Sequence, residues 1–364
     1  MKELNISVYF MWEWWERYFH SSYKRPEKIS EDALDDMYLK RKRFLYDNFG
    51  QYGIGEEMPQ LDGSFVDIVT RYGMDFIPYL FGAELRVQDA GGWMPEPFEK
   101  EILRKMKAVD LKDHPMAEWI IREKEKKIKR YGKASLMIHH EGPTNIAVRM
   151  RGEEFYIDLI EDPSFASYLL ELVSETMFHI FGFTVKNFET NSAFGLGNCN
   201  VTMISPDLYE KVIRPFDIEF SRRSAEISGR YNDLVLHHCD VKVDRFIETY
   251  SRIPNIRALQ ASHDSDIQRV NDIMPEVDFY AMFNPSEISR KTVGEIFCDV
   301  DRAVGIGAKE LDIWNVDPGV DVKKLTDIFD AIVRSCAGHG VKHRFSVIPF
   351  CWDELEWAFP VYVN

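Results

Sequence analysis

The sequence predicts an α/β fold, and within that class a single (β/α)8 barrel with an N-terminal helical and aromatic extension. The first observation is an alternation, because from about Phe76 onward short apolar or β-branched runs alternate with longer amphipathic stretches. The second is length, since 364 residues suffice for one large barrel. The third is that polar residues follow several of the short runs. We therefore expect an extension over residues 1–50 and a barrel over residues 51–364.

The extension is predicted from two aromatic, helix-forming segments. MWEWWERYF, Met11–Phe19, spaces its rings so that some should stay near the surface or line a cleft, as a lid or a dimer contact. The segment Ser30–Gly50 has Ser30 as a plausible N-cap, acids in its first turns and Gly50 just beyond its end. Both patterns are typical of helices.

The barrel is predicted from strands and helices that follow one another along the chain. The expected strands are 135–140, 233–238, 257–260, 278–283 and 310–314. The expected helices are 162–181, 205–227, 243–253, 266–274, 293–305 and 323–336. Ser205 is a predicted N-cap, with Pro206 in the first helical position. A doubly wound open sheet is the alternative architecture, but no Gly-rich turn follows the first predicted strand.

Composition and charge exclude several classes of protein. Hydrophobic residues make up 45% of the chain and aromatic residues 13%, which is typical of a globular protein. The formal net charge of −15 argues against a nucleic-acid binder, which needs a basic face to neutralise phosphates. No segment approaches the roughly 20 apolar residues of a membrane span, and no signal peptide is found. The five cysteines are scattered and odd in number, so we expect a cytoplasmic protein without a disulfide framework.

The residues that could carry chemistry fall at the predicted strand ends. In a (β/α)8 barrel the carboxyl ends of the strands build the active site, so the side chains there are candidates. They are His139, His140, Glu141, Asn198, Cys199, Asn200, His237, Cys239, Ser262, His263, Asp264, Asn284 and Asn315. Together these polar residues form a pattern that any one of them alone would not.

The segment LVLHHCD, Leu234–Asp240, contains the strongest candidate metal ligands. Because side chains alternate along a strand, His237 and Cys239 point the same way and His238 points oppositely. An imidazole and a thiolate presented to one cation are a common half of a zinc site, and a catalytic zinc has three protein ligands and an open position. A packed cysteine beside a hydrogen-bonded histidine is the alternative interpretation of this pair.

Three segments resemble the uroporphyrinogen decarboxylase superfamily. Glu141–Val173 is similar to its G-P-T-A-x-x-x-G strand, helix and following segment, and Gly197–Phe216 to its I-S-P-x-x-F-x-x-F-x-x-P element. LVLHHCD matches the place where the methyltransferase branch of the superfamily carries H-x-C. The resemblance covers roughly Gly50–Cys336, and it implies a (β/α)8 barrel.

The resemblance favours the methyltransferase branch over true uroporphyrinogen decarboxylases. Those enzymes carry an N-terminal R-Q-A-G-R signature whose arginines hold the carboxylates of the substrate. Here the corresponding region is MWEWWERYF, so a substrate with many carboxylates would lack its charge partners. The branch that remains includes methylcobalamin:coenzyme M methyltransferases and related corrinoid-dependent enzymes.

In that branch, the resemblance implies a zinc ion held by the H-x-C pair and by a distant cysteine. Trp314 stands where the distant cysteine is expected. We expect Cys199 to replace it, because GLGNCN precedes a helix N-cap and should lie on the same face of the barrel. The predicted ligands are therefore His237, Cys239 and Cys199. Glu141 could supply an oxygen ligand instead, and a small cysteine packed beneath a ligand is the structural alternative.

The other strand-end residues have expected roles as well. We expect catalytic work from His139, His140, Glu141 and His263. We expect contacts to the cofactor from Asn198, Asn200, Asn284 and Asn315. His263 has a structural alternative, because Ser262, Ser265 and Asp266 form an N-cap signal before a helix.

The sequence thus predicts a corrinoid-linked methyltransferase that moves a methyl group between methylcobalamin, or another methylcorrinoid on a protein, and a small acceptor, a thiol activated by Zn²⁺. Two alternatives stay open. One is a cofactor-free decarboxylase that acts on a carboxylated small molecule. The other is a non-catalytic corrinoid or tetrapyrrole binder that uses His237 or His238. The expected partners are the acceptor, a corrinoid protein and a second copy of the chain in a homodimer.

Overall fold

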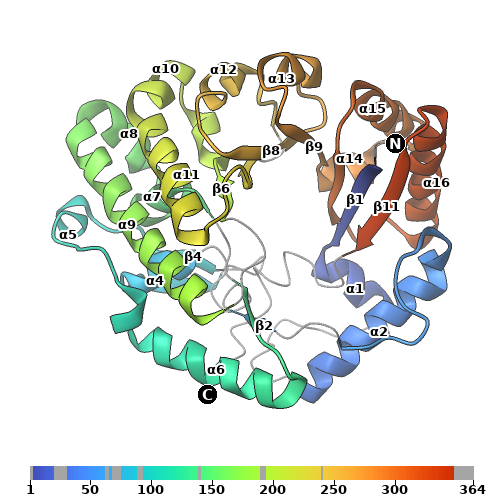
Figure 1. Ribbon diagram of the computed structural model, residues 1–364, viewed down its shortest axis with the longest axis horizontal. Coiled ribbons are helices and arrows are strands. Elements are labelled where there is room, and N and C mark those ends of the chain that lie inside the picture. The colour runs from blue at the N-terminus through green and yellow to red at the C-terminus, as the bar shows by residue number, and fades with distance from the viewer. Residues whose placement is uncertain are drawn as a thin grey trace. The chain divides into compact units, whose positions relative to one another are not determined.

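The computed structural model describes residues 3–19, 31–61, 65–67, 75–87, 93–137, 141–188, 194–238 and 241–347. These residues form an α/β fold in which helices accompany parallel strands (Figure 1). The chain divides into two compact units. The first comprises Met1–Asp62, Asp240–Asp244 and Gln260–Asn364, and the second comprises Gly63–Cys239 and Arg245–Leu259.

The largest sheet is parallel and has seven strands in the hydrogen-bonded order β11-β1-β10-β9-β8-β7-β6. Their bounds are β1 Glu3–Phe10, β6 Leu196–Gly197, β7 Leu234–His237, β8 Ile256–Ser262, β9 Asp278–Phe283, β10 Glu310–Val316 and β11 Lys342–Val347. Two smaller sheets pair β2 (Phe65–Asp67) with β5 (Ser135–Met137) in parallel, and β3 (Leu85–Val87) with β4 (Trp93–Pro95) in antiparallel fashion. Among the described residues no strand pairs with the outer edge of β11 or β6, so closure of the predicted barrel is not observed.

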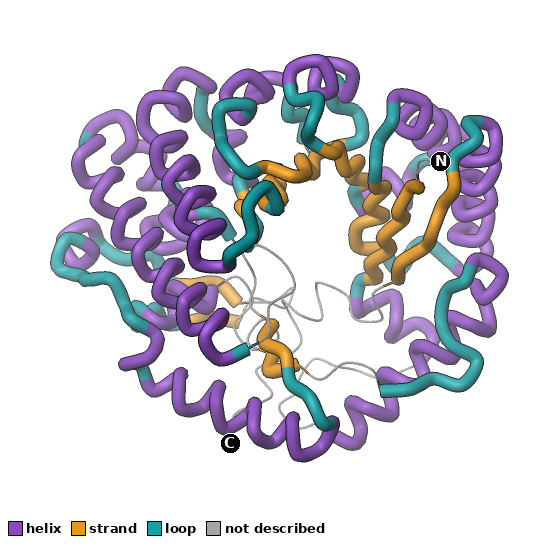
Figure 2. The backbone as a smooth tube through the Cα atoms, viewed as in Figure 1, coloured by secondary structure: helices purple, strands orange, loops and turns teal. Residues whose placement is uncertain are grey.

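The helices of the first unit are α1 Trp12–Phe19, α2 Glu31–Phe49, α13 Ile267–Ile273, α14 Pro285–Arg290, α15 Val293–Ile306 and α16 Val322–Gly338, with a 3-10 turn, η2, at Gly50–Tyr52. Helices α15 and α16 lie side by side, and α16 packs against β11 (Figure 1 and Figure 2). The predicted helices 293–305 and 323–336 and the predicted strand 278–283 are confirmed to within two residues.

The helices of the second unit are α4 Phe76–Leu80, α5 Lys100–Leu103, α6 Pro115–Tyr131, α7 Pro143–Arg151, α8 Glu154–Glu161, α9 Pro163–Asn187, α10 Pro206–Leu208, α11 Arg214–Ser228 and α12 Ile247–Tyr250. Short 3-10 turns are η4 Leu111–Asp113, η5 Cys199–Met203 and η7 Asp244–Phe246, and η6 Tyr209–Ile213 is a π-helix. No helix in the described ranges is long and apolar enough to cross a membrane.

The π-helix divides the helix predicted over residues 205–227. The predicted N-cap is confirmed, because the Ser205 side chain accepts the N–H of Leu208. Pro215 then follows near the start of α11, and it has no N–H to donate to the carbonyl of Lys211. A wider turn before a proline accommodates this missing bond, which explains why η6 precedes α11.

Strand β1 corrects the predicted N-terminal extension. Its sequence ELNISVYF buries Leu4, Ile6 and Val8 on one face and leaves Glu3 exposed on the other. This period of two is typical of a strand, and β1 pairs in parallel with both β10 and β11. The expectation of a helical extension is therefore wrong for residues 3–10, which form an inner strand of the sheet.

The aromatic segment after β1 contributes to the core of the first unit. Trp14 and Trp15 are fully buried, and the Trp14 ring lies 4.3 Å from that of Phe10. Trp14 Nε1 donates to the carbonyl of Val320 at 2.7 Å. The guanidinium of Arg41 lies 4.8 Å from the centre of the Trp15 ring, a cation–π distance. These two tryptophans therefore pack in the interior, where a strand supplies their partners, instead of lining a cleft.

Replacement of Trp14 by alanine should lower the free energy of unfolding by about 3–5 kcal/mol, because the change leaves a cavity and removes the donor to the Val320 carbonyl. Urea unfolding followed by circular dichroism measures this difference. Met58→Ala is the control, since Met58 is 79% exposed, and it should change the value by less than about 0.5 kcal/mol. Equal effects of the two substitutions would contradict the packing described.

Candidate functional site

Strands β6 and β7 place two predicted ligands at neighbouring strand ends. Gly197 lies opposite His237, and the N–H of Asn198 donates to the His237 carbonyl at 2.8 Å. Cys199 comes next and begins η5. Both Cys199 and His237 are half-buried. The structure thus brings the backbones of two predicted metal ligands together, whereas the third, Cys239, lies outside the described residues.

Glu141 lies beside the end of β6. The N–H of Gly142 donates to the carbonyl of Gly197 at 2.9 Å, so the segment before α7 runs along this strand end. Glu141 is buried and accepts a hydrogen bond from Asn145 Nδ2. Asn145 Oδ1 in turn accepts the N–H of Asn200 at 3.0 Å. A carboxylate and an amide are therefore held in fixed positions against the backbone that carries the candidate ligands.

Gly142 is required by the close approach of these two segments. Its backbone angles, φ −87° and ψ 162°, are accessible to any residue. A Cβ at this position, however, would lie 2.3 Å from the Gly197 carbonyl oxygen and 3.2 Å from Asn198 Oδ1. The contact is with backbone, which cannot move aside as a flexible side chain can.

A buried polar cluster lies behind the two strand ends; we call it the Asp217 cluster, and its members are Asn198, Tyr209, Asp217, His238 and Tyr250. All five are fully buried. Asn198 Nδ2 donates to Asp217 Oδ2 at 2.7 Å, and the Tyr209 hydroxyl donates to the same oxygen. The Tyr250 hydroxyl lies 2.8 Å from His238 Nδ1. The rings of Tyr209 and Tyr250 meet edge to face at 5.6 Å, which joins the two halves of the cluster.

Three polar atoms of the Asp217 cluster have no hydrogen-bond partner among the described residues. They are Asn198 Oδ1, Asp217 Oδ1 and His238 Nε2. Buried polar atoms are nearly always paired, so these atoms mark a place where a polar ligand or an ordered water would be stabilised.

Burial perturbs the titration of the cluster. It raises the pKa of Asp217 to about 6, although hydrogen bonds from Tyr209 and Asn198 favour the charged form. It lowers the pKa of His238 to about 3, and the nearby His237 and Arg245 act in the same direction. His238 is therefore neutral at physiological pH. Burial also raises the pKa of the two tyrosines well above its usual value, so both keep their hydroxyl protons.

Charged side chains also lie on and beside α7. Glu141, Asn145 and Arg149 are spaced by four residues, which brings their side chains to one side of this segment. Arg149 donates to Asp75 Oδ1 at 2.8 Å. Burial raises the pKa of Asp75, the Arg149 charge opposes this shift, and the Glu141 charge adds to it. The interaction between the two carboxyl groups indicates that Asp75, Arg149 and Glu141 form one electrostatic group.

Several predicted site residues lie outside the described residues. They are His139, His140 and Cys239, together with the side chains of Trp314 and Asn315, whose backbone belongs to β10. The roles expected for them remain predictions.

His263 belongs to the first unit, where its ring contacts Phe283, Glu287 and Arg302. It is 1% exposed, and its ring stacks on that of Phe283 at 4.2 Å. Nε2 lies 2.9 Å from Glu287 Oε1, and Nδ1 lies 3.3 Å from an Arg302 nitrogen. Burial raises the pKa of Glu287, but His263 and Lys291 outweigh it and lower the pKa to about 2. Both ring nitrogens of His263 are thus engaged in a structural ion-pair network.

The N-cap signal predicted around Asp266 is confirmed, and a second cap, at Asn284, was not predicted. Asp266 caps α13, since its side chain accepts the N–H of Arg269 at 3.0 Å. Asn284 caps α14, and its Oδ1 accepts the N–H of Glu287 at 3.0 Å within a capping box. Asn284, expected to contact a cofactor, therefore uses its side-chain oxygen to begin a helix.

Sequence analysis missed Tyr209, Asp217 and Tyr250. One signal was present for Asp217: it lies on the stripe of α11 and η6 that also carries Ile213 and Phe220, both fully buried. A carboxylate on a buried helical stripe is rare unless it is paired. Tyr209 and Tyr250 offered no comparable signal, because aromatic residues on buried faces are common.

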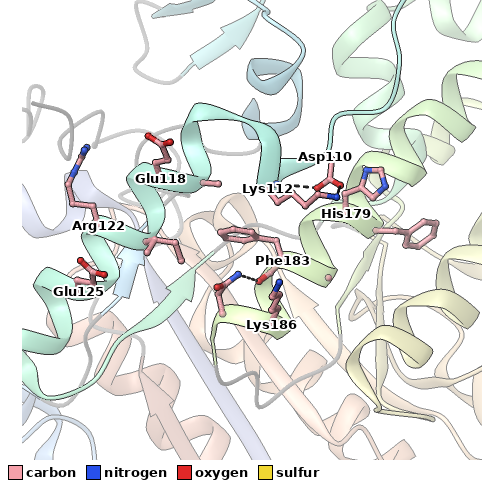
Figure 3. A pocket seen from close by; sticks show the side chains of 13 residues that line it. Asp110, Lys112, Glu118, Arg122, Glu125, His179, Phe183 and Lys186 are labelled. Atoms are coloured by element: carbon pink, nitrogen blue, oxygen red, sulfur yellow. Dashed lines mark hydrogen bonds and ion pairs between the residues drawn. The ribbon is translucent and has the colours of Figure 1, made fainter.

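A separate cavity of about 830 Å³ lies between α6 and α9 (Figure 3). Its apolar lining includes Ile121 and Phe183, and charged side chains such as Glu118, Arg122 and Lys186 surround it. None of the predicted catalytic or metal-binding residues lines this cavity.

Comparison with known proteins identifies the fold. No protein-family model matches the chain, and no curated protein matches it. Among solved structures, the chain is similar to a methyltransferase from Methanosarcina mazei, with a TM-score of 0.57 and 12% sequence identity. The match covers 81% of this chain and 84% of that chain. At this identity the similarity shows a shared α/β fold.

Gly142→Ala should lower the free energy of unfolding by at least about 2 kcal/mol, because the new Cβ clashes with the backbone of β6. Gly182→Ala is a matched control in the same unit. A Cβ at Gly182, inside α9, meets nothing within 4 Å, so alanine should stabilise the protein by about 0.5–1 kcal/mol. Chemical denaturation of both variants measures the difference, and effects of the same sign would contradict the close approach.

The Asp217 cluster also predicts a dependence of stability on pH. Asp217 has a folded pKa of about 6, above its ordinary value of 3.8, so its contribution to stability is present at low pH and is lost as the pH rises through this range. His238 has a folded pKa of about 3, below its ordinary 6.5, so its contribution is present above that value and is lost on acidification. The two contributions oppose each other between about pH 4 and pH 6.

In the Asp217→Asn variant, of these two groups only His238 still contributes to the pH dependence of the free energy of unfolding. The free energy of unfolding of this variant should therefore fall by about 2–3 kcal/mol more than that of the wild type between pH 6 and pH 4. Urea unfolding at a series of pH values tests this result. Parallel pH profiles for the two proteins would show that Asp217 has no raised pKa.

Proposed function

We propose that this chain is a corrinoid-linked methyltransferase that transfers a methyl group between a methylcorrinoid, carried by a separate protein, and a small thiol. We also propose that its strands close into the (β/α)8 barrel of the uroporphyrinogen decarboxylase superfamily. Two findings support the proposal: the sequence segments that resemble the methyltransferase branch, and the fold that the chain shares with a solved methyltransferase.

The pairing of β6 with β7 is the observation that carries the proposal. It brings Cys199 and His237 to adjacent strand ends, and sulfur and imidazole nitrogen are the donors that zinc prefers. Among the described residues no three His, Cys, Asp or Glu side chains form a metal site. Cys239 follows His237 by two residues and would complete the set. We therefore assign His237, Cys239 and Cys199 as zinc ligands, with Glu141 as the alternative third ligand.

Zinc bound to these residues would lower the pKa of a coordinated thiol and so keep it as a thiolate at neutral pH. The chain itself would bind and orient the acceptor. Glu141 and Asn145 would supply a fixed carboxylate and amide beside β6. The thiolate sulfur forms a bond to the methyl carbon while the carbon–cobalt bond breaks and leaves its electron pair on cobalt. The proton of the thiol leaves to solvent before transfer.

The purified protein should contain about one zinc ion per chain. His237→Ala and Cys239→Ala should each lose the zinc and reduce methyl transfer from methylcobalamin to a small thiol by at least about 100-fold. Metal analysis by mass spectrometry and a thiol-consumption assay measure the two effects. His343→Ala and Cys298→Ala are matched controls, because both residues are exposed, and they should retain zinc and activity.

Other outcomes would support the alternatives. Absence of zinc together with absence of methyl transfer would overturn the proposal. Release of carbon dioxide from a carboxylated substrate without a corrinoid would identify a decarboxylase. Binding of cobalamin without turnover of any thiol would identify a non-catalytic binder.

A further inference from the structure

The candidate ligands Cys199 and His237 share one structural feature: each is adjacent in the chain to a member of the Asp217 cluster. Cys199 follows Asn198, and His237 precedes His238. Asn198 and His238 are both fully buried, whereas Cys199 and His237 are half-buried. In each pair one side chain is held in the interior while its neighbour reaches toward solvent.

Anchoring one residue of such a pair restricts the other. Adjacent residues are joined by a planar peptide, so fixing the backbone of one limits where the Cα atom of the next can lie. At the end of β7 the alternation of side chains adds that His238 and His237 point to opposite faces. Hydrogen bonds that hold Asn198 and His238 therefore also aim Cys199 and His237.

Asp217 is the group on which this anchoring depends. Its Oδ2 accepts both Asn198 Nδ2 and the Tyr209 hydroxyl, and Tyr209 packs on Tyr250, which pairs with His238. Without Asp217, Asn198 Nδ2 would keep only the Tyr209 oxygen at 3.3 Å. A carboxylate is costly to bury, and an apolar residue would pack on α11 at lower cost. The hydrogen bonds that this buried network makes restrict the arrangement of the groups that they connect.

We propose that Asp217 is a positioning residue that acts through Asn198, Tyr209 and Tyr250 to fix the relative direction of the Cys199 thiol and the His237 imidazole. The direction of these two side chains can be measured in metal-free protein. The effect of Asp217 on zinc affinity rests on the proposed function, so the test needs one readout without metal and one with zinc.

The metal-free readout is the rate at which iodoacetamide alkylates Cys199 in chelator-treated protein. Peptide mapping measures this rate. Asp217→Ala should raise this rate by at least about fivefold, because the Asn198–Cys199 segment loses its anchor. Asp217→Asn still offers an oxygen to Asn198 and Tyr209, so its rate should stay within about twofold of the wild type. Cys298, which is exposed on α15, is the internal control and should react equally in all proteins.

The second readout is zinc affinity, measured by competition with a chromophoric chelator, and the spectrum of the Co²⁺-substituted protein. Asp217→Ala should weaken zinc binding by about 10–100-fold and shift the cobalt bands, and Asp217→Asn should restore both. Asp158→Ala is the matched control. Asp158 is a buried aspartate of the same unit that pairs with Lys100 and Arg151, so its loss should reduce stability and leave zinc affinity unchanged.

The outcomes separate the positioning role from the proposed function. A folded Asp217→Ala protein with the alkylation rate of the wild type would overturn the positioning role.

If the wild type binds no zinc, the proposed function fails, and the alkylation rates alone decide whether Asp217 is a positioning residue. If Asp217→Ala does not fold, Tyr250→Phe decides, since it removes only the hydroxyl that pairs with His238. It should weaken zinc binding at least threefold, or about 0.7 kcal/mol, and an unchanged affinity and cobalt spectrum would overturn the inference.

Discussion

The hydrogen bonds of the buried Asp217 carboxylate hold together the part of the second unit that carries the candidate site. Asp217 on α11 binds Asn198, which follows β6, and Tyr209 in the π-helix, while Tyr250 and His238 continue the contacts to the end of β7. A buried carboxyl group is costly unless it is hydrogen-bonded, so the elements that bond Asp217 Oδ2 must approach it at hydrogen-bonding distance. The half-buried Cys199 and His237 owe their places to that requirement.

Close backbone contact supplies the other constraint on this site. Gly142 and Gly197 meet where any side chain on Gly142 would collide with the neighbouring carbonyl, and this contact brings Glu141 and Asn145 beside β6. Polar groups from three segments therefore converge on one strand end. The first unit uses its polar groups differently, since His263, Asn284 and Asp266 all serve to cap helices or to bind neighbouring side chains.

A shared fold does not determine chemistry, because one α/β architecture supports many reactions through the residues at its strand ends. The similarity to a methyltransferase from Methanosarcina mazei establishes the architecture at 12% identity, and the proposed activity rests on the residues of the site. The proposed ligands are an imidazole and two thiols, which are groups that zinc prefers.

Local periodicity and helix capping are enough to predict the α/β class, most helices and strands after residue 200, and the helix starts at Ser205 and Asp266. It also singled out His237 and placed His238 on the opposite face, since alternation along a strand is a local property. Tertiary contacts were needed to show that residues 3–10 form an inner strand, that Trp14 and Trp15 are buried, and that Asp217 and Tyr250 are buried and hydrogen-bonded to the residues Asn198 and His238. These outcomes depend on contacts between segments far apart in the chain, and the free energy of burying a polar group is set by partners that local sequence does not reveal.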